Sequence, residues 1–284
     1  MRALTLPAPA KLNLFLHIVG RRADGYHELQ TLFRLIDLCD EVEIELHSAG
    51  DPGVYLQPGS DGPSFGNLAV LAAELLVATV RASTPIAGTA HIRIGLRKRV
   101  PQGGLGGGSS DAATVLLGLN HLLDNPLSLD DLAVLGVTLG ADVPVFVRGR
   151  NAWAEGIGDR LFAIDVPAAW YLVIAPGCEV PTAEVFGHVS LTRNSPLIRM
   201  RGSLESGVRN DCESLVRRLY PEVDRALDWL SARAPARLTG TGGCVFATFP
   251  SQKDAARGAV GLPAPWQAFV AKGLDQSPVH ALLR

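Results

Sequence analysis

The sequence predicts an α+β protein of two lobes, and three observations support this. Stretches with the period-two alternation of half-buried strands are mixed with stretches of helical spacing, without the strict strand–helix alternation of a doubly wound sheet. At 284 residues the chain is long for one compact core. The least compact connection falls near residues 150–168, so we expect an N-terminal lobe over residues 1–155 and a C-terminal lobe over residues 156–284.

The elements of the first lobe follow from the spacing of apolar residues. Apolar and polar residues alternate over residues 11–19, 41–46 and 90–96, which predicts three strands. An Asp-Gly pair between the first two predicts a turn and places Tyr26 and His27 on or next to a loop. Helical spacing predicts helices over residues 67–82, 111–123 and 129–140, the second capped by the Ser and Asp residues at its entrance.

The remaining elements are expected as follows. The apolar run in "ADVPVFVRG" (141–149) is expected to begin a buried strand, and "GIGDRL" (156–161) reads as a turn. Strands are expected over 170–177 and 266–274, a glycine-rich turn and then a strand within 236–249, a short helix over 181–189, and a helical stretch over 210–232 that breaks near Pro221.

Composition excludes several classes of function. Apolar residues make up 47% and charged residues 19% of the chain, as in ordinary globular proteins. A net charge of -2 and one short basic run, "RIGLRKRV", give no field that would favour nucleic acid. The four cysteines lack the spacing of a zinc site, and no apolar stretch is long enough to span a bilayer. We therefore expect a cytoplasmic protein with reduced thiols.

The stretch "PQGGLGGGSSDAATVLL" (101–117) stands between a predicted strand and a predicted helix. Its five glycines would suit either a flexible surface turn or a cradle for an anion, because the N–H groups of a first helical turn are unsatisfied. No lysine follows as in a Walker A motif, and the G-x-G-x-x-G fingerprint fails at Ser109. This crowding of glycine before a helix favours phosphate binding over a plain turn.

The same stretch resembles the phosphate loop of the GHMP kinases, the superfamily of galactokinase, homoserine kinase, mevalonate kinase and phosphomevalonate kinase. "PAKLNLFLHI" near the N-terminus and "LTGTGGCVFA" near the C-terminus strengthen the resemblance. "RADGYHEL", "GADVPVFVRG", "GIGD" and "VPTAEVF" resemble one branch of it, whose substrate is a cytidine-diphospho-alcohol of the methylerythritol phosphate route to isoprenoids. The resemblance runs from Pro7 to about Leu282 and implies a two-lobed fold with the active site in the cleft between the lobes.

The loop departs from the family pattern at one point. Three residues separate Pro101 from Leu105, where the family usually has four. The shorter loop could lie more tightly over the phosphates, which affects its fine geometry and leaves the family resemblance unchanged.

Two charged residues are the candidates for catalysis. On the residues alone, Asp142 is equally well a helix or turn cap or a functional carboxylate, and a strand lysine such as Lys11 usually faces solvent. The resemblance implies that Asp142 takes the proton of the substrate hydroxyl and that Lys11 keeps Asp142 ionised and steadies the developing charge. Asn13 shares a strand face with Lys11 and could bind substrate, the alternative being a surface asparagine.

The resemblance also implies two sets of binding residues, each with a simpler structural alternative. Asn67 and Lys98 match positions near the adenine and ribose but could be a helix N-cap and a solvated lysine; Thr182 and Phe186 match the cytidine pocket, although Phe186 alone would read as a core aromatic. Tyr26 and His27 stand side by side on a segment that is expected to be exposed, where they could hold the cytosine together with Phe186; the alternative is that His27 is only a turn residue. The phosphates of ATP are expected to lie on Pro101, Gln102, Gly103, Gly104, Leu105, Gly106, Gly107, Gly108, Ser109 and Ser110.

The expected cofactors are ATP and Mg²⁺, which should arrive with the nucleotide. The sequence leaves the protein ligands of the metal unassigned, with Ser110 and Asp111 as candidates. Two rival functions remain open: a sibling kinase acting on homoserine or mevalonate, and a nucleotide-binding regulator without catalysis. "GYHEL" and "VPTAEVF" speak against the sibling, and the presence of both Lys11 and Asp142 speaks against the regulator.

Overall fold

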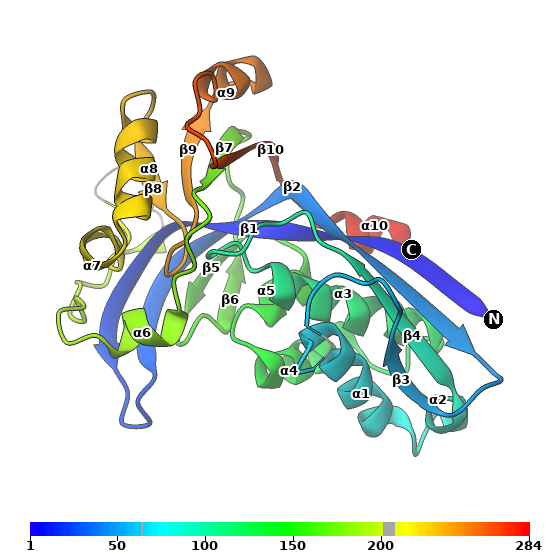
Figure 1. Ribbon diagram of the computed structural model, residues 1–284. Coiled ribbons are helices and arrows are strands. Elements are labelled where there is room, and N and C mark those ends of the chain that lie inside the picture. Colours follow the sequence, from blue (N-terminus) through cyan, green and yellow to red (C-terminus); the bar gives the residue numbers. More distant parts are fainter. Residues whose placement is uncertain (64, 201–207) are drawn as a thin grey trace.

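The computed structural model describes residues 1–63, 65–200 and 208–284 and shows helices and strands mixed around one large sheet (Figure 1). The strands are β1 (Arg2–Arg21), β2 (His27–His47), β3 (Gly53–Leu56), β4 (His91–Arg97), β5 (Ala152–Glu155), β6 (Arg160–Ala163), β7 (Trp170–Ala175), β8 (Ala236–Leu238), β9 (Val245–Phe249) and β10 (Gln267–Leu274). The helices are α1 (Leu68–Val80), α2 (Pro85–Thr89), α3 (Gly107–Leu122), α4 (Leu129–Leu139), α5 (Val143–Arg148), α6 (Thr182–Gly187), α7 (Glu213–Leu219), α8 (Pro221–Ser231), α9 (Gln252–Gly258) and α10 (Pro278–Leu282).

The long antiparallel pair β1 and β2 is the spine of the molecule and crosses its full width in Figure 1. The strand order β3-β4-β2-β10-β7-β9-β8 continues from it, with β1 and β5 also paired to β2. Register shifts follow Pro9, Asn13 and Ile18. These irregularities interrupt the period-two pattern, which explains why the sequence predicts only short parts of both strands.

Two apolar clusters flank this spine. The larger one packs α1, α3, α4 and α5 against β2 and β4. The second packs α6, α7, α8 and α9 on β7, β8 and β9, and it also takes Leu16 and Ile18 from the far end of β1. One strand pair therefore contributes to both cores, and the lobe boundary near residue 155 stays a prediction.

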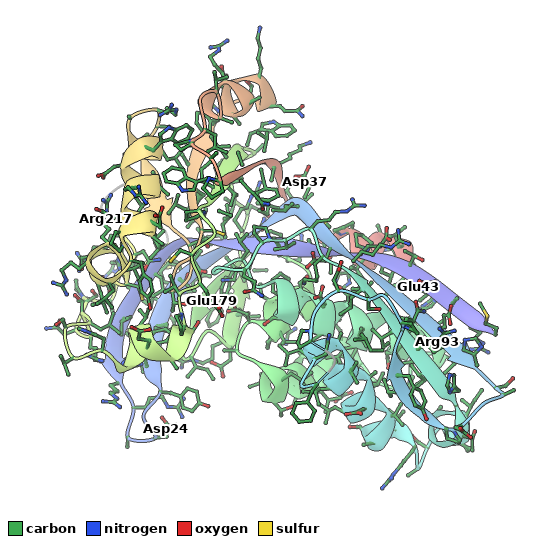
Figure 2. The ribbon with its side chains drawn as sticks, viewed as in Figure 1. Asp24, Asp37, Glu43, Arg93, Glu179 and Arg217 are labelled. Atoms are coloured by element: carbon green, nitrogen blue, oxygen red, sulfur yellow. The ribbon has the colours of Figure 1, made fainter. Side chains whose placement is uncertain are left out.

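Charged side chains line the outer surface of the spine. The alternating burial of β2 leaves Glu43 and Glu45 on the side away from the core, where Glu45 pairs with Arg93 of β4 at 3.5 Å, and Asp24 lies in the turn that joins β1 to β2 (Figure 2). The expected Asp-Gly turn is therefore present. Among the described residues, no helix has both the length and the apolar character that a membrane span requires.

Helix α3 begins differently from the expectation. It starts at Gly107, and its N-cap is Gly106 in the left-handed conformation (φ 72°), without any side-chain cap bond. The predicted Ser and Asp capping is therefore wrong. Ser110 and Asp111 lie inside the helix and are buried, and the Ser110 hydroxyl donates to the Pro9 carbonyl at 2.7 Å. The first turn keeps its backbone N–H groups free of side-chain partners.

The segment 141–149 is also a correction, because it forms the short helix α5 where a strand is expected. Pro144 stands in its first turn, a position that suits a helix start and not a central strand. Its apolar residues are buried on all sides, packed between α3 and α4, so their pattern carries no helical period. The other expected helices are present, including the break between α7 and α8 at Pro221.

Candidate active site

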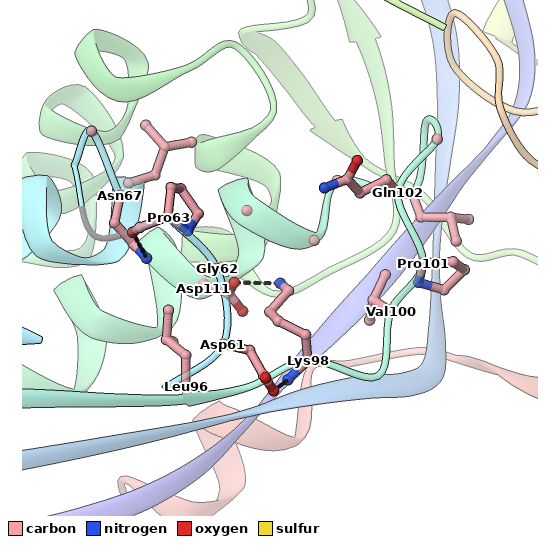
Figure 3. Close-up of a pocket in the computed structure, with 17 residues that line it drawn as sticks. Asp61, Gly62, Pro63, Asn67, Leu96, Lys98, Val100, Pro101, Gln102 and Asp111 are labelled. Atoms are coloured by element: carbon pink, nitrogen blue, oxygen red, sulfur yellow. Dashed lines mark hydrogen bonds and ion pairs between the residues drawn. The ribbon is translucent and has the colours of Figure 1, made fainter. Parts of the chain in front are cut away.

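Three neighbouring cavities mark the candidate site. The first, which we call the phosphate cavity, encloses about 590 Å³ between the glycine loop, Lys98 and Asn67 (Figure 3). The central cavity, about 270 Å³, is lined by Lys11, Asn13 and Asp142. The aromatic cavity, about 500 Å³, is lined by Tyr26, His27 and Phe186.

The central and aromatic cavities adjoin each other, and the glycine loop separates them from the phosphate cavity. The central and aromatic cavities share Leu29, Ala141, Ile157, Thr182 and Phe186. The glycine loop divides the central cavity from the phosphate cavity, because Gly104 and Ser109 line the former while Gly106, Gly107 and Gly108 line the latter. A ligand that extends from the aromatic cavity into the central cavity would therefore meet the glycine loop beside Lys11 and Asp142.

Lys11 is buried, so the expectation that a strand lysine faces solvent fails here. Its ammonium donates to Asn13 Oδ1 at 2.6 Å and to the Gly104 carbonyl at 2.9 Å, and lies 3.2 Å from Asp142 Oδ2. Three acceptors match the three donors of the ammonium, which fixes the side chain in place.

Asp142 holds the N-cap position of α5 but makes no side-chain cap bond there. Its carboxylate turns instead to Lys11 and remains a third exposed, at the wall of the central cavity. The geometry therefore favours the functional alternative for Asp142 over the capping one. A partly exposed carboxylate beside a buried cation can accept a proton from a hydroxyl that binds in this cavity.

Asn13 is buried and lies on the Lys11 face of β1, as the spacing predicts. Its amide nitrogen donates to Thr31 Oγ1 at 2.9 Å, and its backbone N–H donates to Thr239 Oγ1 at 3.1 Å. A surface asparagine is therefore excluded. Because the amide oxygen of Asn13 accepts from Lys11 and its amide nitrogen donates to Thr31, Asn13 orients Lys11. It also lines the central cavity.

The first glycines of the loop have a packing role. The loop packs against residues 239–244, and the Cys244 N–H donates to the Gly103 carbonyl at 3.1 Å. A Cβ on Gly104 would lie 2.1 Å from the Thr239 carbonyl oxygen, and a Cβ on Gly103 would lie 2.7 Å from Gly243 Cα. These two glycines allow two backbones to touch, which explains why both segments are rich in glycine.

The later glycines are different. Gly107 and Gly108 have ordinary helical φ, and a Cβ on Gly108 would meet only Leu68 Cδ1 at 3.6 Å. Both line the phosphate cavity where the first turn of α3 offers free N–H groups. Pro101, Gln102 and Leu105 also line this cavity, whereas Ser109 faces the central cavity and Ser110 is buried away from both.

Lys98 is held by two buried carboxylates, so the solvated alternative is wrong. Its ammonium makes a short contact with Asp40 Oδ2 and lies 2.5 Å from Asp111 Oδ2, the latter drawn in Figure 3. Burial raises the pKa of Asp111 to about 6, against the opposing effect of Lys98. Asn67 caps α1 by accepting from the Ala69 N–H at 3.0 Å, so its structural alternative holds while it also lines the phosphate cavity.

The aromatic cavity combines one exposed and two packed rings. Tyr26 is 61% exposed, whereas His27 is buried, so the expectation that both lie exposed is wrong for His27. The rings of His27 and Phe186 stack with centroids 5.1 Å apart and planes at 22°. No flat ligand fits between these two rings, which leaves Tyr26 as the free stacking face. Thr182 contacts Thr241 through hydroxyls 2.9 Å apart.

Sequence reasoning missed three residues that shape the site. Asp40 accepts from the N–H groups of Arg99 and Val100 and from Lys98. It shares the strand face of buried Val42, whereas Glu41 lies on the outer face, and this polar residue at a buried position is a signal that could have found it. Thr31 and Arg193 carry no such signal, because only the fold brings them to Asn13 and His27.

The residues around α3 offer little for a metal. Among residues 1–63, 65–200 and 208–284, no three acidic, histidine or cysteine side chains gather into a metal cluster. The Ser110 hydroxyl is engaged by Pro9, whereas Asp111 Oδ1 is buried without a hydrogen-bond partner in this part of the chain. A Mg²⁺ ion that arrives with ATP needs only one or two carboxylates, so Asp111 fits and Ser110 does not.

The comparisons with known proteins agree with this geometry. Residues 67–150 match the N-terminal domain of the GHMP kinases and residues 196–268 match their C-terminal domain. The chain belongs to the GHMP kinase family, and so it is an ATP-dependent phosphotransferase.

Within that family, full-length relatives are 4-diphosphocytidyl-2-C-methyl-D-erythritol kinases. That of Pseudomonas paraeruginosa is 51% identical over 99% of this chain and 97% of its own length. That of Chromohalobacter salexigens is 52% identical over 100% and 95%. A solved 4-(cytidine 5'-diphospho)-2C-methyl-D-erythritol kinase is 34% identical, covers 95% of this chain and 99% of its own, and has a TM-score of 0.80. A mevalonate kinase shares the fold alone, at 16% identity and a TM-score of 0.67.

Proposed function

We propose that this protein transfers the γ-phosphoryl group of ATP to the 2-hydroxyl of 4-diphosphocytidyl-2-C-methyl-D-erythritol, giving the 2-phosphate and ADP. One observation carries the proposal: the Lys11–Asp142 pair lies in the central cavity, which the glycine loop separates from the phosphate cavity and which adjoins the aromatic cavity on its other side. The substrate's base would occupy the aromatic cavity and its alcohol the central one. The full-length relatives named for this activity support the same substrate.

The chemistry needs positioning more than covalent help. Asp142 accepts the proton as the 2-hydroxyl oxygen bonds to the γ-phosphorus and the bond to the ADP oxygen breaks. Lys11, fixed by Asn13 and the Gly104 carbonyl, pairs with Asp142 and lies beside the loop where negative charge accumulates. The free N–H groups of the α3 turn hold the phosphates, and Lys98, whose ammonium lies next to Gly107, supplies a cation beside them.

Mg²⁺ is part of this proposal as the partner of ATP. When bound, it would neutralise phosphate charge, with Asp111 as the protein oxygen that fits it. Lys98 already neutralises one oxygen of Asp111, so the carboxylate is oriented before the nucleotide arrives.

A direct test measures ADP formation by the purified protein with 4-diphosphocytidyl-2-C-methyl-D-erythritol, homoserine and mevalonate in parallel. We expect turnover with the cytidine compound alone, and ³¹P NMR should place the new phosphate on the 2-oxygen. Preference for mevalonate or homoserine would favour the sibling kinase, and ATP binding without turnover of any alcohol would favour the regulator.

We also propose that the protein works in the cytoplasm. All four cysteines are free thiols, two of them buried, as suits a reducing compartment. Cell fractionation with an antibody against the protein tests this, and recovery in the membrane or extracellular fraction would contradict it.

A further inference from the structure

Arg193 is a hydrogen-bonding hub behind the aromatic cavity. It lies in the connection between α6 and α7, and its Nε donates to His27 Nε2 at 2.9 Å. Its Nη2 donates to the carbonyls of Phe186 and His188 at 2.9 and 2.8 Å, and its Nη1 donates to the Leu191 carbonyl at 3.1 Å. One side chain therefore holds both members of the His27–Phe186 stack.

These contacts determine which nitrogen of His27 carries the proton. A guanidinium can only donate, so Nε2 must present its lone pair to Arg193. The proton of the neutral ring then sits on Nδ1. Two further facts keep the ring neutral: burial and the positive charges of Arg193 and Arg21 lower the pKa of His27. Phe186, the other group stacked on the ring, brings no charge.

The Nδ1–H is the ring donor that remains for a ligand. Among the described residues, Nδ1 has no hydrogen-bond partner, and His27 lines the aromatic cavity. Cytosine and uracil differ at N3, which accepts a hydrogen bond in cytosine and donates one in uracil. A donor fixed at Nδ1 pairs with the former and opposes the latter, leaving two donors unpaired.

We propose that Arg193 is a positioning residue that selects the substrate's base by locking His27 in the Nδ1–H form. The inference rests on the proposed function, because it takes the base to lie in the aromatic cavity. Arg193 itself does not contact the base. Its hydrogen bond to the Phe186 carbonyl holds in place the residue whose ring stacks on His27.

The first test needs no variant. In protein labelled with ¹⁵N-histidine, at a pH where the ring is neutral, the ¹⁵N shifts of His27 report which nitrogen is protonated. The signal is assigned by its loss in His27→Gln. We expect the proton on Nδ1, and finding it on Nε2 overturns the proposal. This readout involves no substrate, so it stands even if the proposed function fails.

The second test compares kcat/KM for the cytidine substrate and its uridine analogue. Arg193→Met removes every donor, so we expect a shift of His27 toward the Nε2–H form and a cytidine preference at least about tenfold weaker. Arg209→Met is the matched control: Arg209 donates to Asp211 and Ser195 near the same connection and does not contact His27. An unchanged preference in Arg193→Met, or an equal loss in Arg209→Met, overturns the proposal.

Arg193→Lys covers the case in which the methionine variant does not fold. It keeps the charge and one donor for Nε2, so we expect the Nδ1–H form and most of the preference to persist. Loss of preference with the Nδ1–H form intact would show that the tautomer is not the cause. Separately, Tyr26→Ala and Phe186→Ala test the pocket: if neither raises KM for the cytidine substrate, the placement of the base fails whatever the tautomer of His27.

Discussion

Two lysines of this protein are each paired with carboxylates beside a cavity, and they differ in which partner is buried. The side chain of Lys11 is 3% exposed and that of Asp142 33% exposed. For Lys98 the order reverses: its side chain is 29% exposed, whereas those of Asp40 and Asp111 are 0% and 5% exposed. The first pair presents a carboxylate to its cavity, and the second presents an ammonium.

This difference shows how the same residue types can serve opposite purposes. A buried charge needs a partner that fixes it in place, while the more exposed partner keeps a face for a ligand. We propose that Lys11 thereby positions Asp142 to act as a base toward a hydroxyl, and that Asp40 and Asp111 position Lys98 to act as a cation toward a nucleotide. The predictions below separate the two roles, in order of expected effect.

Replacing the exposed carboxylate should have the largest effect. Asp142→Asn keeps the shape and removes the base, so kcat should fall by about 10²–10⁴-fold with the KM for ATP nearly unchanged. Steady-state kinetics with varied ATP measures both. Near-normal kcat would show that transfer does not use a base and that the two lysine clusters do not differ in the way described.

Removing its buried partner should have the next largest effect. Lys11→Met keeps the volume but leaves Asp142 without its cation, so we expect a fall in kcat of about 10²-fold or more. Single-turnover measurements at saturating ATP isolate the transfer step. A change confined to the KM for ATP would show that Lys11 contributes to nucleotide binding. The two lysine clusters would then not differ in role.

The second lysine should show the opposite kinetic pattern. Lys98→Met should raise the KM for ATP roughly tenfold with a small change in kcat, since a charged hydrogen bond contributes about 1.5–3 kcal/mol. It should also lower the free energy of unfolding by up to about 3–5 kcal/mol, because Asp40 stays buried without its cation.

The double variant Lys98→Met/Asp40→Asn is the control for this prediction. It removes the charge of the Asp40 carboxylate, which would otherwise be buried without a cation. The free energy of unfolding should therefore recover in part, whereas the affinity for ATP should not. Recovery of both quantities together would mean that Lys98 acts only by supporting the structure. Denaturant unfolding and equilibrium ATP binding give the two numbers independently.

A residue outside both clusters should affect neither of them. Tyr26 is largely exposed, so Tyr26→Ala should leave thermal stability and the KM for ATP unchanged. Stacking of a base on an aromatic ring contributes about 1–3 kcal/mol, so the KM for the cytidine substrate should rise roughly tenfold. An unchanged KM would remove Tyr26 from the site.

The glycine loop allows the finest distinction. Gly108→Ala places a Cβ in ordinary contact inside α3, so it should raise the KM for ATP severalfold at unchanged or slightly higher stability. Gly104→Ala is the counterpart and should be strongly destabilising, because its Cβ meets the Thr239 carbonyl oxygen. Gly106→Val would mix both effects, since Phe146 lies 2.9 Å from its Cβ position. Equal losses in the alanine variants would mean a purely structural loop.

Local sequence information predicted much of the candidate site. The crowding of glycines before a helix indicated an anion site at the start of α3, and a spacing of two placed Lys11 and Asn13 on one face of β1. The same local rules failed at 141–149, where four buried apolar residues and a proline form a helix because α3 and α4 enclose them. They also missed the true start of α3, whose N-cap is a glycine in a left-handed conformation.

The sequence by itself determined the element types with clear periodicity, the glycine-rich loop before α3 and the family to which the chain is similar, because these depend on residues close together along the chain. Only the tertiary structure decided which charge of each lysine–carboxylate cluster faces a ligand. Asp142 lies 131 positions after Lys11 and Asp40 lies 58 positions before Lys98, so their burial depends on strands and helices that meet only in the folded chain. Exposure, and with it the choice between base and cation, is a property of that packing.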